Sequence, residues 1–279
     1  MEYKLIAIDM DGTLLSNRHE IPEYNKEMIK RATKAGVKIA ITTGRLFASA
    51  RKYSELIGVE TPIIASNGAY IREKDREEII YESKLTRKQF DEILSVIKKY
   101  DFTVYMNTSD TVISEGIVPD DHAYKLVNNE LDDAWKIKFV EKTSFEEVYD
   151  QFSNDILKFI CIEERETRDE LMKAKAELAQ FEDLEVVSSW DNNFEVMAQG
   201  TSKGKAVEKL AQVLGIKREE VICIGDSEND LSMVQYGGLG VAMGNAIDIV
   251  KENADYITDT NTNAGVGKMI AKFIFNEEV

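Results

Sequence analysis

Histidine, cysteine and proline are scarce in this chain of 279 residues, which has 2 histidines, 2 cysteines and 3 prolines. Zinc sites are built from clusters of histidine and cysteine, and neither His19 nor His122 lies near another potential ligand in the sequence. Cys161 and Cys223 each lie inside an apolar run, so we expect two buried free thiols in a reducing compartment. These scarcities argue against a zinc site and against a disulfide framework.

Basic residues are in the minority, with 35 Lys and Arg against 51 Asp and Glu, for a formal net charge of -16. Nucleic acids and anionic membranes attract basic surfaces, so we expect neither as a partner. No signal-peptide pattern and no apolar run of membrane-spanning length is visible, which predicts a cytoplasmic protein. An anionic substrate would need local help from a metal ion or a few well-placed cations.

The chain does contain a short Ile-rich run, residues 4–8, that ends at Asp9, and Asp11 follows just before a glycine. Such a run is typical of a buried strand in a parallel sheet. Open α/β sheets bind ligands beyond the carboxyl ends of their strands, where both carboxylates would emerge. Two carboxylates so close repel one another and need a cation or a proton. A bare Asp-x-Asp pair, however, is more often an acidic turn.

Helix and strand patterns alternate in the first third of the chain, with helices over 21–35 and 46–57 and strands over 37–42 and 62–65. The alternation returns from residue 202, with helices over 203–214, to about 236 and over 247–252, and strands over 221–224, 240–243 and 256–257. This order predicts a doubly wound α/β core with a parallel sheet.

The middle third has a different order of elements. We expect helices over 86–100, within 120–130, over 144–152 and over 166–181, and strands over 102–106, 111–114, 156–162, 184–188 and 194–197. Several consecutive strands among helices indicate a separate α+β domain inserted into the first. We therefore expect a discontinuous core of residues 1–84 and 195–279, and an inserted domain of residues 85–194 that acts as a lid.

Further polar residues follow predicted core strands or open core helices. Thr43 and Arg45 follow the second strand, Lys203 opens a helix, and Asp226 and Asp230 follow a late strand. Each cluster alone has an ordinary explanation: a capping turn, a solvated lysine, or acidic residues at a helix start. Together they place hard oxygen ligands without histidine at one sheet edge, which points to Mg²⁺.

Four segments of the chain resemble, in order, the four motifs of the haloacid dehalogenase superfamily: Asp9-Met10-Asp11-Gly12-Thr13, Thr43-Gly44-Arg45, Lys203 and Gly225-Asp226-Ser227-Glu228-Asn229-Asp230. The large insert resembles the α+β cap, of the C2 type, of the Cof-type sugar-phosphatase branch. The resemblance covers the whole chain. It implies a Mg²⁺-dependent phosphatase that hydrolyses small phosphate monoesters, most of all sugar phosphates, through an aspartyl-phosphate intermediate.

The resemblance also implies catalytic and metal-binding roles. Asp9 would be the nucleophile, and Asp11 the general acid and then the general base. Mg²⁺ would be held by Asp9, Asp226 and the backbone carbonyl of Asp11. Asp230 would steady a metal-bound water or Lys203, and Lys203 would supply a positive charge to the phosphate and keep Asp9 ionised.

Other matching residues would bind the phosphate ester. The Thr43 hydroxyl and the Gly44 amide would bind phosphate oxygens, and Asn229 would donate to them as well. For Arg45 we hold open a substrate contact and an ion pair on the core. For Asn67, which precedes a glycine, we hold open a substrate contact and a simple turn.

The lid would select the substrate, but the sequence does not tell which of its residues face the cleft; candidates are Tyr105, Asn107, His122, Tyr124, Lys125 and Trp190. A lid this large favours a small soluble phosphate ester, with nucleotide, flavin and pyridoxal phosphates as further options. The alternatives to a phosphatase are a phosphomutase and a non-catalytic phosphometabolite sensor, and a dehalogenase is least favoured because that branch needs neither Asp11 nor the metal. Members of the superfamily are often monomers or weak homodimers.

Overall fold

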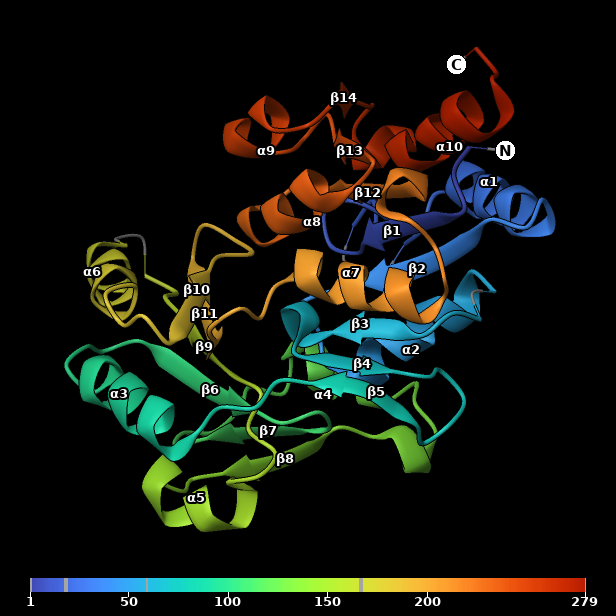
Figure 1. Ribbon diagram of the computed structural model, residues 1–279. Coiled ribbons are helices and arrows are strands. Elements are labelled where there is room, and N and C mark those ends of the chain that lie inside the picture. Colours follow the sequence, from blue (N-terminus) through green and yellow to red (C-terminus); the bar gives the residue numbers. More distant parts are fainter. Residues whose placement is uncertain (1, 18–19, 59, 166–167, 279) are drawn as a thin grey trace.

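The computed structural model describes residues 2–17, 20–58, 60–165 and 168–278, and these residues form two β-sheets (Figure 1). The large sheet has eight strands in the order β14 (Tyr256–Ile257), β13 (Leu239–Ala242), β12 (Val221–Gly225), β1 (Leu5–Asp9), β2 (Lys38–Thr42), β3 (Ile63–Ala65), β4 (Tyr70–Arg72) and β5 (Ile79–Glu82). The first and last thirds of the chain therefore share one sheet, as the blue and orange strands of Figure 1 show.

Strand β1 lies at the point where the strand order reverses. It is parallel to both β12 and β2; the early strands extend the sheet on one side and the late strands on the other. A parallel α/β sheet binds its ligand at such a switch point, beyond the carboxyl ends of the strands. Asp9, the last residue of β1, therefore stands where a ligand is expected.

Helices cover both faces of the large sheet because residues of β1 alternate between two apolar clusters. Ile6 and Ile8 pack with α1 (Glu23–Lys34), α2 (Phe47–Leu56), α9 (Asp248–Glu252) and α10 (Gly265–Phe275). Leu5 and Ala7 pack with α7 (Lys203–Val213) and α8 (Leu231–Tyr236) on the other face. This period of two is that of an extended strand buried on both faces.

The small sheet has six strands in the order β10 (Leu184–Val187), β11 (Asn193–Ala198), β9 (Lys158–Ile162), β6 (Thr103–Asn107), β7 (Thr111–Ser114) and β8 (Lys138–Glu141). One face is apolar and packs under α3 (Arg87–Ile97), α5 (Phe145–Phe152) and α6 (Asp169–Leu178). The helix α4 (Ala123–Asn128) contributes to a separate apolar cluster with Leu46 of the large-sheet unit. The two units are therefore packed against one another.

The predicted fold class, a doubly wound α/β core with an inserted α+β unit, is confirmed. The elements β4, β5, β8 and α10 are not predicted from the sequence. After β3, the left-handed backbone of Ser66 (φ 51°) and Asn67 (φ 54°) turns the chain back, so that β4 runs antiparallel to β3. The expected boundary at residue 194 falls inside β11, which pairs with β9 and β10. His19 and the expected helix start at 166–167 lie outside the described residues.

Two expectations about composition can be compared with the structure. Cys161 and Cys223 are free and buried, as expected. Among the described residues, no helix is long and apolar enough to cross a membrane.

Candidate active site

A cavity of about 540 Å³ lies between the carboxyl end of the large sheet and the face of the small sheet that α3, α5 and α6 leave uncovered. Five of the predicted site residues line it: Asp9, Asp11, Gly44, Arg45 and Asn229. The other five, Thr43, Asn67, Lys203, Asp226 and Asp230, are buried directly behind this wall. All ten belong to one connected region, which the following contacts define.

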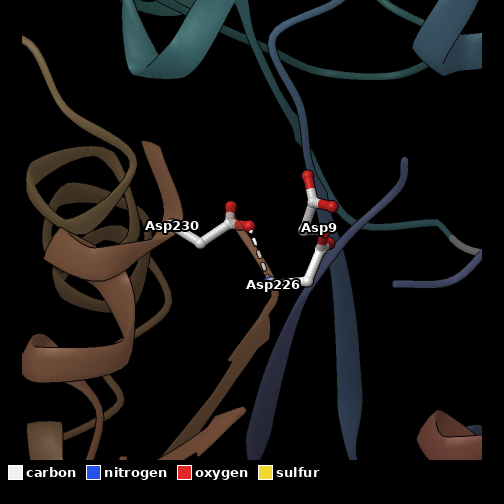
Figure 2. A group of neighbouring side chains, drawn as sticks. All are labelled: Asp9, Asp226 and Asp230. Atoms are coloured by element: carbon white, nitrogen blue, oxygen red, sulfur yellow. Dashed lines mark hydrogen bonds between the residues drawn. The ribbon is translucent and has the colours of Figure 1, made fainter. Parts of the chain in front are cut away.

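Three carboxylates converge at the carboxyl ends of β1 and β12. Asp9, Asp226 and Asp230 each offer an oxygen, and these atoms lie within 4.8 Å of one another (Figure 2). They meet because β1 and β12 are parallel neighbours, with Ile8 opposite Ile224, so both strands end at the same level. The three side chains are buried, and Asp230 is 0% exposed.

Lys203 is the one cation in contact with this triad among the described residues. Its Nζ donates to Oδ1 of Asp9 and to Oδ1 of Asp230, at 2.6 Å in both cases. Because one ammonium faces three carboxylates, two negative charges are left over if all of them are ionised. Buried charges without partners are strongly destabilising, so this site requires two protons or a divalent cation.

The pKa values of the cluster also show that its negative charges are unfavourable without a further cation. Burial, together with the carboxylate of Asp230, raises the pKa of Asp9 well above its usual range, although Lys203 opposes the shift. Burial and Asp230 also raise the pKa of Asp226 to about 7. The pKa of Lys203 is raised too: burial acts to lower it, but Asp230 and Asp9 outweigh that effect. A bound cation would favour the ionised carboxylates instead.

Neighbouring groups hold Asp226 and Asp230 in fixed orientations. Oδ2 of Asp230 accepts hydrogen bonds from the backbone amides of Asp226 and Ser227, at 2.9 and 3.0 Å. The Thr13 hydroxyl donates to Asp226 at 2.6 Å. Gly12 has φ +82°, and a Cβ there would lie 2.4 Å from Oδ2 of Asp226. The Gly12-Thr13 pair is therefore needed for close approach and for orientation, a role that the sequence analysis did not assign.

Asp11 lies apart from the triad and faces the cavity. Arg45 binds it with both ends of the guanidinium: Nε donates to Oδ2 at 2.8 Å and Nη2 to Oδ1 at 2.5 Å. Of the two possibilities held open for Arg45, the structure shows the ion pair. Asp9 and Asp11 are thus two residues apart in the chain, yet one belongs to the buried triad and the other to a part-exposed pair.

Hydrogen bonds link the remaining predicted residues. The backbone amide of Asn67 donates to the backbone carbonyl of Thr43 at 3.0 Å. The side-chain Nδ2 of Asn229 donates to Oδ1 of Asn67 at 3.0 Å. The Thr43 hydroxyl accepts from the Arg45 backbone amide at 3.1 Å. Asn67 is therefore part of a strained turn and also of a network that reaches the cavity wall.

The opposite wall of the cavity contains a buried ion pair, Lys158 with Glu195, that the sequence analysis missed. Nζ of Lys158 also donates to the Gly44 carbonyl at 2.5 Å, which joins the small sheet to the loop after β2. The Ser189 hydroxyl donates to Glu195 at 3.0 Å. The signals in the sequence were a lysine at the start of an otherwise apolar strand and polar residues at alternate positions of β11.

Most lid candidates lie where the sequence analysis allowed: Tyr105, Asn107, His122, Tyr124 and Trp190 line the cavity. Lys125 does not belong to the lining, and instead forms an ion pair with Glu141. The Tyr124 hydroxyl accepts a hydrogen bond from the Leu46 amide at 3.1 Å, across the two units.

Comparison with known proteins relates this site to characterised chemistry. Residues 6–270 match the family of haloacid dehalogenase-like hydrolases. The chain is 34% identical over 276 residues to a 5-amino-6-(5-phospho-D-ribitylamino)uracil phosphatase of Bacillus subtilis, and the match covers 98% of this chain and 97% of that protein.

Two solved structures are similar over nearly the whole chain. A haloacid dehalogenase-like hydrolase from B. subtilis has a TM-score of 0.84 at 29% identity, with 97% of this chain and 99% of that chain covered. A sugar phosphatase of subclass IIB of the same superfamily has a TM-score of 0.78 at 26% identity, with coverage of 97% and 98%.

Proposed function

Since the chain belongs to the haloacid dehalogenase-like hydrolases and is an enzyme of their phosphatase class, we propose that it is a Mg²⁺-dependent phosphatase for small phosphate monoesters, sugar phosphates above all. The observation that carries this proposal is the contrast between Asp9 and Asp11. One carboxylate is buried beside a lysine and two further carboxylates, and the other faces the cavity. Such a pair suits a nucleophile and a separate acid–base group.

The donor set fits a hard divalent cation. Asp9 and Asp226 offer carboxylate oxygens, and the two uncompensated negative charges of the cluster match the charge of Mg²⁺. The backbone carbonyl of Asp11 is the third ligand that we propose. Both Asp230 oxygens already accept hydrogen bonds, so we assign Asp230 to holding Lys203 and the Asp226 loop in place. When bound, Mg²⁺ would neutralise charge on the phosphoryl oxygens.

In the first half-reaction, a carboxylate oxygen of Asp9 attacks phosphorus, the bond to the ester oxygen breaks, and Asp11 gives a proton to the leaving alcohol. Lys203 holds Oδ1 of Asp9, so we assign the attack to Oδ2. The ion pair with Arg45 occupies both Asp11 oxygens. We therefore propose that the substrate competes with Asp11 for Arg45, and that the freed carboxylate takes up from solvent the proton that it then gives to the leaving alcohol.

In the second half-reaction, Asp11 takes a proton from water, the water oxygen attacks phosphorus, and the bond to Asp9 breaks. Inorganic phosphate leaves, and both carboxylates return to their starting states. The Thr43 hydroxyl, the Gly44 amide, Asn229 and Lys203 would hold the phosphoryl oxygens during both steps. Positioning and charge neutralisation of this kind supply most of the catalysis in phosphoryl transfer.

The division of labour follows the two units. We propose that residues 1–84 and 195–279 form the catalytic core, and that residues 85–194 form the lid that excludes water and contacts the leaving group. The relatives support phosphate esters of sugar-like or polyol-containing compounds, since one is named a sugar phosphatase and another a phosphatase of a ribitylaminouracil phosphate. The two buried free thiols are consistent with a reducing compartment, and we propose the cytoplasm.

The test is phosphate release from a panel of sugar, nucleotide and cofactor phosphates, with Mg²⁺ or with chelator, for the wild type and Asp9→Asn. Release that requires both the metal and Asp9 is the expected result. Release that persists in Asp9→Asn would contradict the nucleophile assignment. If no ester releases phosphate, a bisphosphate activator separates a mutase, which then interconverts phosphate positions, from a protein that only binds.

A further inference from the structure

One buried asparagine on the cavity wall has no side-chain hydrogen-bond partner among the described residues. Asn107 is 0% exposed, yet neither its Nδ2 nor its Oδ1 contacts a donor or acceptor among the described residues. Leaving a buried polar group unpaired costs about 1–3 kcal/mol. Native structures keep few such groups, and each calls for a reason.

The position of Asn107 gives that reason. It ends β6, directly opposite Lys158 of β9 and Val112 of β7, so these three side chains share one face of the small sheet. All three line the cavity, as does Tyr105 two residues earlier. Asn107 therefore lies on the sheet face that borders the same cavity as Asp9 and Asp11, with its amide atoms covered by neighbouring atoms.

The neighbours of Asn107 have already found partners. Lys158 is engaged by Glu195 and by the Gly44 carbonyl, and Glu195 also accepts from Ser189. The contact with Gly44 fixes this part of the small sheet against the proposed phosphate-binding loop. Of these polar groups, the Asn107 amide is the one without a hydrogen-bond partner among the described residues, so its donors and acceptor would be satisfied by a ligand that reaches it.

We propose that Asn107 is a specificity-determining residue whose amide binds hydroxyl groups of the leaving group, so that the enzyme prefers polyol or sugar phosphates to phosphate esters without hydroxyls. An amide offers two N–H donors and a carbonyl oxygen on adjacent atoms. Hydroxyl groups both donate and accept, so a pair of neighbouring hydroxyls satisfies Nδ2 and Oδ1 together. An anionic group would use the donors alone. This inference rests on the proposed phosphatase function.

The experiment compares two substrates of equal chain length, a pentitol 5-phosphate and pentyl phosphate, in the Mg²⁺-loaded enzyme. In Asn107→Leu, kcat/KM for the pentitol phosphate should fall about 10- to 100-fold, which corresponds to the loss of two hydrogen bonds. The value for pentyl phosphate should change by less than about twofold. The melting temperature should not fall, because Leu has the same branched shape and removes both unpaired polar groups.

Asn128→Leu is the matched control. Both polar atoms of that amide are paired with the backbone of Ile137, at 2.7 and 2.9 Å, and it does not belong to the cavity lining. This variant should lower the melting temperature and leave the ratio of the two kcat/KM values unchanged. Asn107 and Asn128 thus separate recognition from structural support.

Other results overturn the inference. An unchanged substrate ratio in Asn107→Leu, or an equal loss on both substrates with a lower melting temperature, would assign Asn107 a structural role. A selective loss on nucleotide phosphates would mean that the amide binds a base edge and not hydroxyls. Asn107→Ala repeats the test if the Leu variant does not fold. A wild type inactive on every ester would contradict the proposed function itself, and this inference with it.

Discussion

The two walls of the cavity are built on different principles. The wall at the end of the large sheet is a closed network in which Asp9, Lys203, Asp230 and Asp226 are held by one another and by backbone amides. The wall of the small sheet has the Lys158–Glu195 ion pair beside the Asn107 amide, which has no partner in the described part of the chain. The first wall carries surplus negative charge when its three carboxylates are ionised, and we propose that its Lys–Asp contacts serve the reaction. The second is electrically balanced in its Lys–Glu pair and leaves a neutral group open.

This difference separates side chains whose positions must be fixed for phosphoryl transfer from side chains that can vary with the leaving group. Phosphoryl transfer needs the same charges in the same places for every ester. The side chains of the large-sheet wall are accordingly held in place by backbone amides and by one another. Leaving groups differ between esters, and a single unpaired amide on the small sheet can be changed without disturbing the hydrogen bonds of the large-sheet wall. Substitutions in each wall should therefore have different effects.

The largest effect is expected at the nucleophile. Asp9→Asn keeps the volume and removes the attacking charge, so turnover should fall by at least about 10³-fold while the melting temperature changes little or rises. Steady-state phosphate release and a thermal melt measure both. Asp133→Asn changes an exposed carboxylate outside the cavity lining; this control should retain full activity. Wild-type turnover in Asp9→Asn would show that the large-sheet wall does not supply the nucleophile.

Asp11→Asn should slow both half-reactions by about 10²- to 10⁴-fold, the range for loss of a general acid or base. Its pH–rate profile should lose the limb that reports on this group. The profile of kcat/KM across the pH range, compared between wild type and variant, is the measurement. A variant profile identical in shape to that of the wild type would exclude Asp11 as the acid–base group.

The two buried lysines provide a direct comparison of the walls. Lys203→Met and Lys158→Met each leave buried carboxylates without a cation and should each cost about 3–5 kcal/mol in the free energy of unfolding. Lys203→Met should also abolish turnover. Lys158→Met should keep it within about tenfold, because its hydrogen bond to the proposed phosphate-binding loop is to the Gly44 carbonyl and not to the amide that we assign to phosphate. Denaturant unfolding and phosphate release measure the two effects.

A double variant checks the explanation. Lys158→Met combined with Glu195→Gln removes both charges of the small-sheet pair and should recover most of the lost stability. If the double variant is as unstable as Lys158→Met alone, the loss arises from packing and not from the unpaired carboxylate. Equal losses of turnover in Lys158→Met and Lys203→Met would erase the functional distinction between the walls.

The smallest effect concerns metal and pH. Without metal, the pKa of Asp226 is about 7 in the folded chain, against about 3.9 when unfolded, so the folded state holds a proton that the unfolded state has lost. This contribution to stability is fully present below about pH 4 and is lost as the pH rises through about 7. Mg²⁺ should therefore raise the melting temperature more at pH 7.5 than at pH 5.5.

The measurement is a thermal melt with Mg²⁺ and with chelator at both pH values. At a hundredfold excess over Kd, the metal should add about 2.7 kcal/mol at the higher pH, a shift of roughly 5–10 °C. Equal shifts at the two pH values would show that the carboxylates do not give up protons to the metal. No shift at either pH would remove the divalent cation from the account.

The sequence predicts the large-sheet wall well because local rules are sufficient there. Asp9 and Asp226 each end an apolar strand, and parallel strands end at a common edge, so their meeting follows from the strand pattern alone. The sequence could not supply the hydrogen bond of Thr13 to Asp226 or the pairing of Arg45 with Asp11, since both depend on side-chain directions. The assigned catalytic roles stay predictions until the variants are measured.

The small-sheet wall resists prediction for a physical reason. Glu195 and Asn107 occupy alternate positions with other polar residues in their strands, a pattern that ordinarily indicates a face in contact with water, and Lys158 begins an otherwise apolar strand. Here the other unit covers that face, and the three residues are only 0–2% exposed. A single strand carries no information about what covers its polar face, so burial between two units remains invisible in the sequence.

The central claim is that Asp9 becomes phosphorylated during turnover. The direct measurement is mass spectrometry of Asp11→Asn after mixing with Mg²⁺ and the best ester of the panel, followed by an acid quench and peptide mapping. Because the second half-reaction lacks its base, the phosphoryl group should accumulate on the peptide that contains Asp9 and should be absent from Asp9→Asn. Turnover of the ester without any phosphorylated peptide, or with the group on another residue, would contradict the account.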